Sequence, residues 1–323
     1  MKTVEVLGMG SNARLEIGSR DIPTPSLEQV LIKVHAAGVN RADILQKQGK
    51  YPPPKGASDV LGLEVSGQVV EVGEGVKGLK KGDKVCALLD GGGYAEYAIA
   101  NQACVLPIID NMSFEQAASL PESLFTSWSN IFTHANMKEG ECLLFHGGTS
   151  GVGVMALQIA KEFGIKCYAT AGSKEKCDFL NNLGVDKAIN YKEQNFVEII
   201  KESGGVDVVI DMVGGDYWTK NLKLLKKGGR LISIAMINGA KAEINFVPLL
   251  INNLTLKGTT LRSKPVDFKA SIQKELVQNI LPKLKDGAIK PIVDSVFDIE
   301  DVEKAHNLML SSQHIGKIVL KIC

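Results

Sequence analysis

Residues 142–164, which read CLLFHGGTSGVGVMALQIAKEFG, constrain the fold of this chain more than any other stretch. A short apolar run from Cys142 to Phe145 leads directly into the glycine-rich turn HGGTSGVG. Polar residues then recur at three- and four-residue spacing. The apolar run is typical of a buried parallel strand, and the later spacing is typical of a helix that packs on a sheet. The stretch therefore predicts a strand, a tight turn and a helix.

The turn contains glycine at positions 147, 148, 151 and 153, a spacing that departs from the usual G-x-G-x-x-G. Two interpretations follow from the residues alone. The free N–H groups at the start of the helix bind a pyrophosphate, or the small residues only allow the helix to pack closely on the strand.

The sequence after this stretch repeats the alternation of strands and helices. The predicted elements are strand 166–173, helix 174–183, strand 188–191, helix 196–201, strand 206–215, a helix that ends at 225, and strand 229–236. This alternation predicts a doubly wound parallel sheet, which binds its ligand outside the carboxyl ends of the strands. A nucleotide site is the interpretation that the alternation favours.

Composition bounds the rest of the chain. The 323 residues, with 45% hydrophobic and 23% charged, suit two globular domains. The formal net charge of +1 indicates neither a nucleic-acid partner nor an anionic membrane. No run approaches the roughly 20 apolar residues of a membrane span, and the six scattered cysteines are typical of reduced, buried thiols. We expect a cytoplasmic protein without a membrane partner.

The segments on either side of the predicted parallel sheet have a different pattern. Strand-like runs separated by glycine and proline turns make the N-terminal part rich in β-structure; they are 30–40, 66–73, 83–89 and 93–100. A helical stretch over 112–132 changes direction at Pro121. After residue 261 the pattern predicts a helix over 267–287 and a final pair of strands.

Several motifs together identify a family. They include GVNRAD (38–43), GLEVSGQVVEVGEGV (62–76), HGGTSGVG (146–153) and GKIVL (316–320). With these motifs the chain resembles the zinc-free quinone oxidoreductase branch of the medium-chain dehydrogenase/reductase superfamily. The details QGKYPPP and ALLDGGG are most similar to its tumour-suppressor-inducible group, which is related to ζ-crystallin.

The resemblance implies an α/β protein of two domains. A GroES-like β-rich catalytic domain would consist of residues 1–123 with 263–323. A Rossmann domain with a doubly wound parallel sheet, which binds NADPH, would span residues 124–262.

The end of the second predicted strand indicates which nicotinamide cofactor binds. An NAD site places Asp or Glu there, whereas a 2′-phosphate requires that this carboxylate be absent. Residues 171–176 read AGSKEK, without an acid at the strand end. The resemblance implies that Ser173, Lys176 and Tyr191 hold the 2′-phosphate of NADPH. The alternative is that Lys174 and Lys176 are only solvated residues at a helix start.

The resemblance also implies the remaining site residues. Asn40 and Tyr51 would line the acceptor site, and Tyr51 would either donate a hydrogen bond to a quinone oxygen or form an apolar wall. Further cofactor contacts would come from Thr126, Ser150, Gly151, Val152, Gly153, Gly172, Arg262 and Lys317.

No metal site is expected. A catalytic zinc needs three protein ligands and a structural zinc needs four, and the sequence contains no clustered set of either kind. Zinc-bearing relatives have a cysteine where this chain has Asn40 and a histidine where it has Leu63. His146, Asp43 and Glu64 are interpreted as structural residues, although His146 could also serve as a ligand or base.

The predicted function is an NADPH-dependent reduction of small quinones without a metal. Hydride transfer to an electron-poor acceptor needs little acid–base catalysis by the protein. The alternatives are an NADPH-dependent enone or enoyl reductase and a non-catalytic NADPH-binding protein. We expect a homodimer, and strand 231–237 is a candidate for extending the sheet across the dimer axis.

Overall fold

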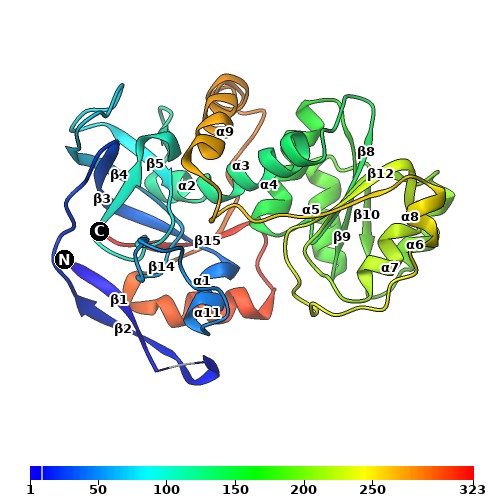
Figure 1. The fold of residues 1–323 in the computed structure, drawn as a ribbon, viewed down its shortest axis with the longest axis horizontal. Coiled ribbons are helices and arrows are strands. Elements are labelled where there is room, and N and C mark those ends of the chain that lie inside the picture. The colour runs from blue at the N-terminus through cyan, green and yellow to red at the C-terminus, as the bar shows by residue number, and fades with distance from the viewer. Residues whose placement is uncertain (9) are drawn as a thin grey trace. The chain divides into compact units, whose positions relative to one another are not determined.

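The computed structural model describes residues 1–8 and 10–323, and the chain divides into two compact units. Unit 1 comprises Met1–Phe125 and Leu261–Cys323, and unit 2 comprises Thr126–Thr260. In Figure 1, unit 1 is drawn in blue through cyan to bluish green and again in orange to red, and unit 2 is mostly green and yellow. The α/β class predicted from the sequence is confirmed.

Unit 2 contains a six-stranded parallel sheet with the order β10-β9-β8-β11-β12-β13. The strands are β8 (Cys142–His146), β9 (Lys166–Ala171), β10 (Lys187–Asn190), β11 (Val206–Asp211), β12 (Leu225–Ser233) and β13 (Thr255–Gly258). This is the strand order of dinucleotide-binding sheets. The predicted doubly wound sheet is therefore confirmed.

The π-helix η3 (Ser129–His134) precedes β8 in the chain. The helices that connect the parallel strands are α4 (Gly151–Glu162), α5 (Lys174–Leu183), α6 (Phe196–Glu202), α7 (Tyr217–Leu222) and α8 (Val247–Ile251). β8 is buried along its whole length, which explains why its sequence is apolar throughout rather than alternating.

Unit 1 contains a mostly antiparallel seven-stranded sheet with the order β14-β15-β3-β4-β5-β7, and β6 also pairs with β3. These strands are β3 (Gln29–Val39), β4 (Glu64–Val72), β5 (Lys84–Leu88), β6 (Tyr97–Asn101), β7 (Val105–Pro107), β14 (Val293–Asp298) and β15 (Lys317–Lys321). The hairpin of β1 (Lys2–Leu7) and β2 (Arg14–Ser19) forms a separate sheet.

The helices of unit 1 come from both of its chain segments. They are α1 (Arg41–Lys47), α2 (Phe114–Ala118), α3 (Pro121–Trp128), α9 (Val266–Asn279), α10 (Leu281–Lys285) and α11 (Val302–Ser311). Short 3-10 helices are η1 (Gly10–Asn12), η2 (Gln102–Cys104) and η4 (Ile299–Asp301). Pro121 begins α3, as the change of direction predicted, and α3 continues into unit 2.

β15 is the strand that returns the C-terminal segment to unit 1. It pairs antiparallel with β3, so that Ile318 lies opposite Val39 and Leu320 lies opposite Ala37. All four of these side chains are fully buried. This pairing brings Lys317, the first residue of β15, to the end of β3.

The prediction that strand 231–237 lies at a free sheet edge is wrong. Residues 231–233 belong to β12, which pairs with β11 on one side and with β13 on the other. Leu231 and Ile232 are fully buried. The apolar run reflects burial on both faces of the sheet, and the short, more polar β13 is the edge strand.

Two further findings bear on the composition argument. All six cysteines are free thiols, and five of them are buried. Among residues 1–8 and 10–323, no helix has the length and apolar character that crossing a membrane would require.

Candidate functional site

The glycine turn of unit 2 joins β8 to the start of α4. Ser150 is the N-cap of α4: its Oγ accepts a hydrogen bond from Gly153 N at 3.0 Å and donates one to Gly147 O at 2.8 Å. A Cβ at Gly153 would lie 2.5 Å from Gly147 O, so the turn requires glycine there. Helix geometry leaves the N–H groups of Gly151 and Val152 without an intrahelical acceptor. These groups can receive a phosphate oxygen.

A second set of polar groups lies at the carboxyl end of β9. Ser173 is the N-cap of α5, and its Oγ accepts a hydrogen bond from Lys176 N at 3.3 Å. A Cβ at Gly172 would lie 2.9 Å from Tyr191 Oη, which places the phenol beside this strand end. The side chain of Glu175 is exposed. Hydroxyl groups and a lysine, without a carboxylate at the strand end, suit a ribose phosphate.

These two sets are neighbours because β8 and β9 are adjacent parallel strands. Gly148 N donates to Thr170 O at 3.0 Å, which joins the glycine turn to the end of β9. Ser127 Oγ donates to Val152 O at 3.3 Å, which brings the end of α3 to the start of α4. Thr126 is the residue before Ser127, and it is buried. Unit 2 thus brings its predicted cofactor residues to one edge of the sheet.

His146 is a structural residue, as its position at a strand end indicates. Its ring is fully buried and forms hydrogen bonds to Thr170 Oγ1 at 3.0 Å and to Asn221 Oδ1 at 2.7 Å. Burial lowers its pKa to about 4, so the ring is neutral near pH 7. A neutral imidazole with both nitrogens engaged is not available as a catalytic base.

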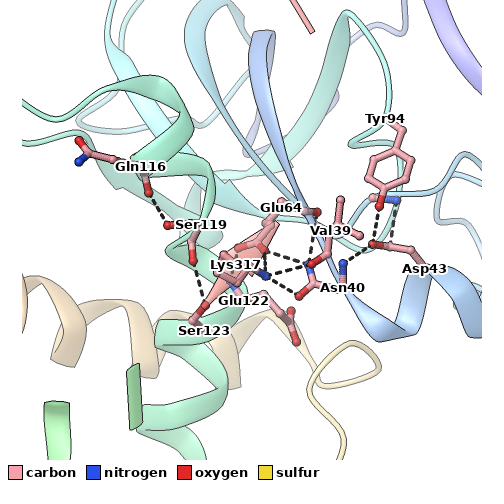
Figure 2. Close-up of polar contacts among 12 residues, drawn as sticks. Val39, Asn40, Asp43, Glu64, Tyr94, Gln116, Ser119, Glu122, Ser123 and Lys317 are labelled. Atoms are coloured by element: carbon pink, nitrogen blue, oxygen red, sulfur yellow. Dashed lines mark hydrogen bonds and ion pairs between the residues drawn. The ribbon is translucent and has the colours of Figure 1, made fainter. Parts of the chain in front are cut away.

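Unit 1 contains a buried polar network that consists of Asn40, Asp43, Glu64, Tyr94 and Lys317 (Figure 2). Lys317 Nζ donates to Glu64 Oε1 at 2.5 Å, to Asn40 Oδ1 at 2.7 Å and to Val39 O at 3.4 Å. These three acceptors match the three protons of the ammonium group. The amine of Lys317 is therefore fully engaged inside unit 1.

Asn40 and Glu64, which accept hydrogen bonds from this ammonium, form further hydrogen bonds of their own. Asn40 Nδ2 donates to Glu64 Oε1 at 2.9 Å, and Glu122 N donates to Glu64 Oε2 at 2.9 Å. Glu64 is fully buried, and Asn40 is 9% exposed. The ammonium and the two N–H donors compensate the charge of the buried Glu64 carboxylate.

Asp43 continues the network toward α11. Its Oδ2 accepts hydrogen bonds from Asn40 N at 2.8 Å and from Tyr94 Oη at 2.9 Å, and its Oδ1 accepts one from Gly62 N at 3.2 Å. Tyr94 Oη also lies 3.3 Å from His306 Nε2. Burial raises the pKa of Asp43 to about 6 and lowers the pKa of His306 to about 4. The interpretation of Asp43 and Glu64 as structural residues agrees with these contacts.

Tyr51 and Arg262 form a separate contact in unit 1. The guanidinium carbon of Arg262 lies 5.5 Å from the centroid of the Tyr51 ring, within the range of a cation–π interaction. Arg262 is 6% exposed, and its Nε and Nη2 both donate to Asp90 O. Burial is the main cause that raises the pKa of the Tyr51 phenol and lowers that of the Arg262 guanidinium.

The sequence analysis missed three residues that position these groups: Asp90, Glu122 and Lys269. Lys269 Nζ donates to Asp90 Oδ1 at 2.6 Å across a separation of 179 residues, and Glu122 reaches Glu64 across 58 residues. No local motif marks such partners. The signal in the sequence was a lysine at helical spacing from apolar residues: Lys269 lies three residues before Ile272 and seven before Leu276 on α9.

Within residues 1–8 and 10–323, no group of three or more His, Cys, Asp or Glu side chains is arranged to hold a metal ion. Asn40 and Glu64 are instead bridged by the Lys317 ammonium.

Two family models match the chain. One is described as the alcohol dehydrogenase GroES-like domain and matches residues 26–110. The other is described as zinc-binding dehydrogenase and matches residues 151–277. The first lies in unit 1, and most of the second lies in unit 2.

Individual relatives resemble the chain over its whole length. A quinone oxidoreductase of Rattus norvegicus is 34% identical, with 99% of this chain and 97% of the relative covered. The crystal structure of Escherichia coli quinone oxidoreductase complexed with NADPH has a TM-score of 0.88 at 28% identity and covers all of both chains. The CurK enoyl reductase has a TM-score of 0.86 at 27% identity, with 100% of this chain and 99% of that chain covered.

Proposed function

Because this chain belongs to the quinone oxidoreductase branch of the medium-chain dehydrogenase/reductase superfamily, we propose that it is an NADPH-dependent oxidoreductase whose acceptors are small quinones. The observation that carries the choice of acceptor is the burial of the acidic groups in unit 1. Asp43 and Glu64 are both fully buried and accept hydrogen bonds from the protein. A quinone accepts hydride without a protein carboxyl group beside it.

The residues of unit 2 fit NADPH. The N–H groups of Gly151 and Val152 would bind its pyrophosphate, and Ser173, Lys176 and Tyr191 would bind its 2′-phosphate. When bound, NADPH supplies the hydride. The protein orients the cofactor, excludes water and stabilises charge on the acceptor oxygen.

An enone or enoyl reductase is the second candidate function, and the likeness to the CurK enoyl reductase favours it. The same cofactor residues would serve this reaction. Only the acceptor distinguishes the two candidates. If the protein binds NADPH but reduces no acceptor, we would conclude that it is a non-catalytic NADPH-binding protein.

The reaction would proceed without a metal ion. Asn40 stands where zinc-bearing relatives carry a cysteine ligand, and its Oδ1 accepts a hydrogen bond from the Lys317 ammonium at 2.7 Å. This ammonium also pairs with Glu64, so a resident cation already balances the buried carboxylate. The metal content of the protein is measured, and any metal is then removed with a chelator. We expect the treated protein to keep full activity. Activity that a chelator abolishes and zinc restores would contradict this part of the proposal.

The test of the proposed function is oxidation of NADPH and, separately, of NADH with a small quinone and with a simple enone. We expect turnover with the quinone and a preference for NADPH. Lys176→Ala should lower that preference at least about tenfold, equal to about 1.4 kcal/mol. Lys174→Ala is the matched control, because the Lys174 side chain is 83% exposed and pairs with Asp178. Saturable NADPH binding without turnover would refute the proposal that the protein is an enzyme. A preference for the enone would favour an enone or enoyl reductase.

A homodimer formed through unit 2 is part of the proposal. Four apolar residues in and beside α8 are strongly exposed: Phe246 (55%), Val247 (54%), Leu250 (72%) and Ile251 (69%). They precede the edge strand β13 in the chain. Apolar residues gathered in this way are typical of an interface.

Sedimentation of the wild type and of Leu250→Glu tests the dimer. We expect a wild-type dimer and a monomeric variant. Leu27→Glu, in unit 1, is the control at a residue of similar exposure, 65%, and should remain dimeric. A wild-type monomer would contradict the proposal. A cytoplasmic location stays a prediction, supported by the six free thiols.

A further inference from the structure

Arg262 has a buried hydrogen-bond donor without an acceptor. Its Nε and Nη2 both donate to Asp90 O, at 2.8 and 2.5 Å, whereas Nη1 has no partner in the described chain. The residue is 6% exposed. Two of its donors are thus fixed on one carbonyl oxygen, and the third points away from that bond.

The charge of Arg262 is also uncompensated at close range. The residue forms no ion pair in the described part of the chain, because the acceptor of its donors is the main-chain oxygen of Asp90. The carboxylate of Asp90 is instead paired with Lys269 Nζ at 2.6 Å, and Lys269 is 3% exposed. The Asp90 carboxylate thus pairs with Lys269, whereas the Arg262 guanidinium donates to the main-chain oxygen of the same residue.

Such an arrangement is unfavourable in the free protein. Burying a charged group without a partner costs free energy, and native structures leave few buried donors unpaired. An unpaired buried donor is therefore a candidate for binding a ligand that carries an acceptor oxygen, above all an anionic one.

The surroundings of Arg262 define what such a ligand would contact. The Tyr51 ring lies 5.5 Å from the guanidinium carbon and is half-buried. A Cβ at Gly91 would lie 3.3 Å from Arg262 Nη2 and in conflict with Ser58 O, so glycine allows this loop to approach the guanidinium. Lys269 Nζ also donates to Arg262 O at 3.0 Å, which holds the main chain in place. The donor is rigid and lies beside an aromatic side chain.

We propose that Arg262 Nη1 binds the reducible oxygen of the acceptor, and that the protein consequently prefers quinones with negative charge on or next to that oxygen. This inference rests on the proposed quinone reduction. Hydride addition to a quinone breaks the carbonyl π bond and leaves its electron pair on oxygen. A proton from water gives a hydroxydienone, which becomes the hydroquinone when its C–H proton is lost to water and the second carbonyl oxygen takes up a proton. A guanidinium N–H stabilises the negative oxygen, and Tyr51 forms the aromatic wall beside it.

This role differs from the cofactor contact that family resemblance implies for Arg262. We assign Arg262 to the acceptor because Tyr51, which the resemblance places at the acceptor site, lies 5.5 Å from its guanidinium carbon. Arg262 would therefore determine the affinity for the acceptor and leave the affinity for NADPH unchanged.

The test measures binding without turnover. The probes are 2-hydroxy-1,4-naphthoquinone, which is ionised at neutral pH, and its neutral 2-methoxy analogue. Each is titrated calorimetrically into cofactor-free wild type, Arg262→Met and Arg262→Lys. We expect the wild type to prefer the ionised quinone and Arg262→Met to lose about tenfold in its affinity for that quinone, with Arg262→Lys between them. NADPH affinity, measured separately, should be the same in all three proteins.

Arg20→Met is the matched control. The Arg20 guanidinium is engaged by Glu5 and Asp59, so the variant should retain the preference of the wild type. Thermal unfolding of each variant checks that it is folded, and Arg262→Lys keeps the test available if Arg262→Met is not.

The outcomes separate this inference from the proposed function. Equal affinity of wild type and both Arg262 variants for the ionised quinone would overturn the inference, even if the wild type reduces quinones. Weaker NADPH binding in the variants with unchanged quinone affinity would overturn it too. Selective loss of quinone binding in a protein that never turns over would support the anion site and refute the reductase.

Discussion

The glycine turn of unit 2 and the buried network of unit 1 place their polar groups by different means. In unit 2, Ser150 and Ser173 each follow the strand that precedes them and cap the helix that comes next. In unit 1, Lys317 meets Glu64 across 253 residues and Asn40 across 277. Local sequence builds the first site, and strand pairing between distant segments builds the second. A substitution of Gly153 or Ser173 should change cofactor binding as well as stability, whereas loss of Lys317 from the buried network should chiefly change stability.

The largest expected effect is that of Lys317→Met. Removal of the ammonium leaves the buried Glu64 carboxylate without its cation, which typically costs about 3–5 kcal/mol. Denaturant unfolding of the variant measures this loss. Lys304→Met is the control, because the Lys304 side chain is 70% exposed and its pair with Asp301 lies at the surface; it should change the free energy of unfolding by less than about 0.5 kcal/mol. Equal effects of the two substitutions would mean that the network does not stabilise unit 1.

The second prediction concerns the pH dependence of stability. The folded-state pKa of Asp43 is raised to about 6 from 3.8, so the native state binds more protons than the unfolded state between these values. The contribution of Asp43 to stability is therefore fully present below pH 3.8 and is lost as the pH rises through 6, with a total on the order of 3 kcal/mol.

The contribution of His306 to stability has the opposite pH dependence, because its folded-state pKa is lowered to about 4 from 6.5. The native state binds fewer protons in this window, and stability rises as the pH rises through it. Asp43→Asn removes only the contribution of Asp43 to stability, which decreases as the pH rises. The free energy of unfolding of Asp43→Asn should therefore rise more steeply between pH 4 and 6.5 than that of the wild type. An identical slope in the two proteins would contradict the assigned pKa of Asp43.

Gly153→Ala tests the unit 2 side of the comparison. The new Cβ would lie 2.5 Å from Gly147 O and 2.8 Å from Gly148 O, both of which are backbone atoms. We expect a loss of about 1–3 kcal/mol from the forced backbone shift, together with weaker NADPH binding. Gly258→Ala is the control, since a Cβ there meets nothing within 4 Å. Unchanged NADPH affinity in Gly153→Ala would show that the turn only packs the helix on the strand.

The smallest expected effect comes from Ser173→Ala. Loss of the N-cap of α5 should cost about 1 kcal/mol of stability. Because the same hydroxyl is proposed to contact the 2′-phosphate, the preference for NADPH over NADH should also fall. Asn195→Ala is a matched control: it removes another N-cap of unit 2, that of α6, and should leave the cofactor preference intact. A change of preference in both variants would point to helix fraying instead.

Sequence periodicity predicted the parallel sheet because each strand and helix of unit 2 has its own apolar pattern. Ser150 and Ser173 were identifiable for the same reason: a cap is adjacent in sequence to the helix it begins. The edge of the sheet was not predictable in this way. An apolar sequence such as that of Leu231 and Ile232 suits an edge strand as well as a buried one. The pairing of β12 with β13 makes this strand an interior one.

The partners of Lys317 and Arg262 lay beyond the reach of local patterns. Resemblance pointed to both residues, but their contacts depend on which main-chain and side-chain atoms distant segments bring together. Asp90 is an example, because its carbonyl oxygen holds Arg262 while its carboxylate holds Lys269. Only the folded chain reveals that one donor of Arg262 is left unpaired.

The measurement that tests the account most directly is a crossed kinetic experiment on Lys176→Ala, Arg262→Lys and the double variant. The KM for NADPH and the KM for a hydroxyquinone are determined for each protein. We expect Lys176→Ala to raise only the KM for NADPH and Arg262→Lys to raise only the KM for the quinone. The effects should add in the double variant, as they do for independent sites. A rise in the NADPH value caused by Arg262→Lys, or in the quinone value caused by Lys176→Ala, would contradict the division between a cofactor site in unit 2 and an acceptor site in unit 1.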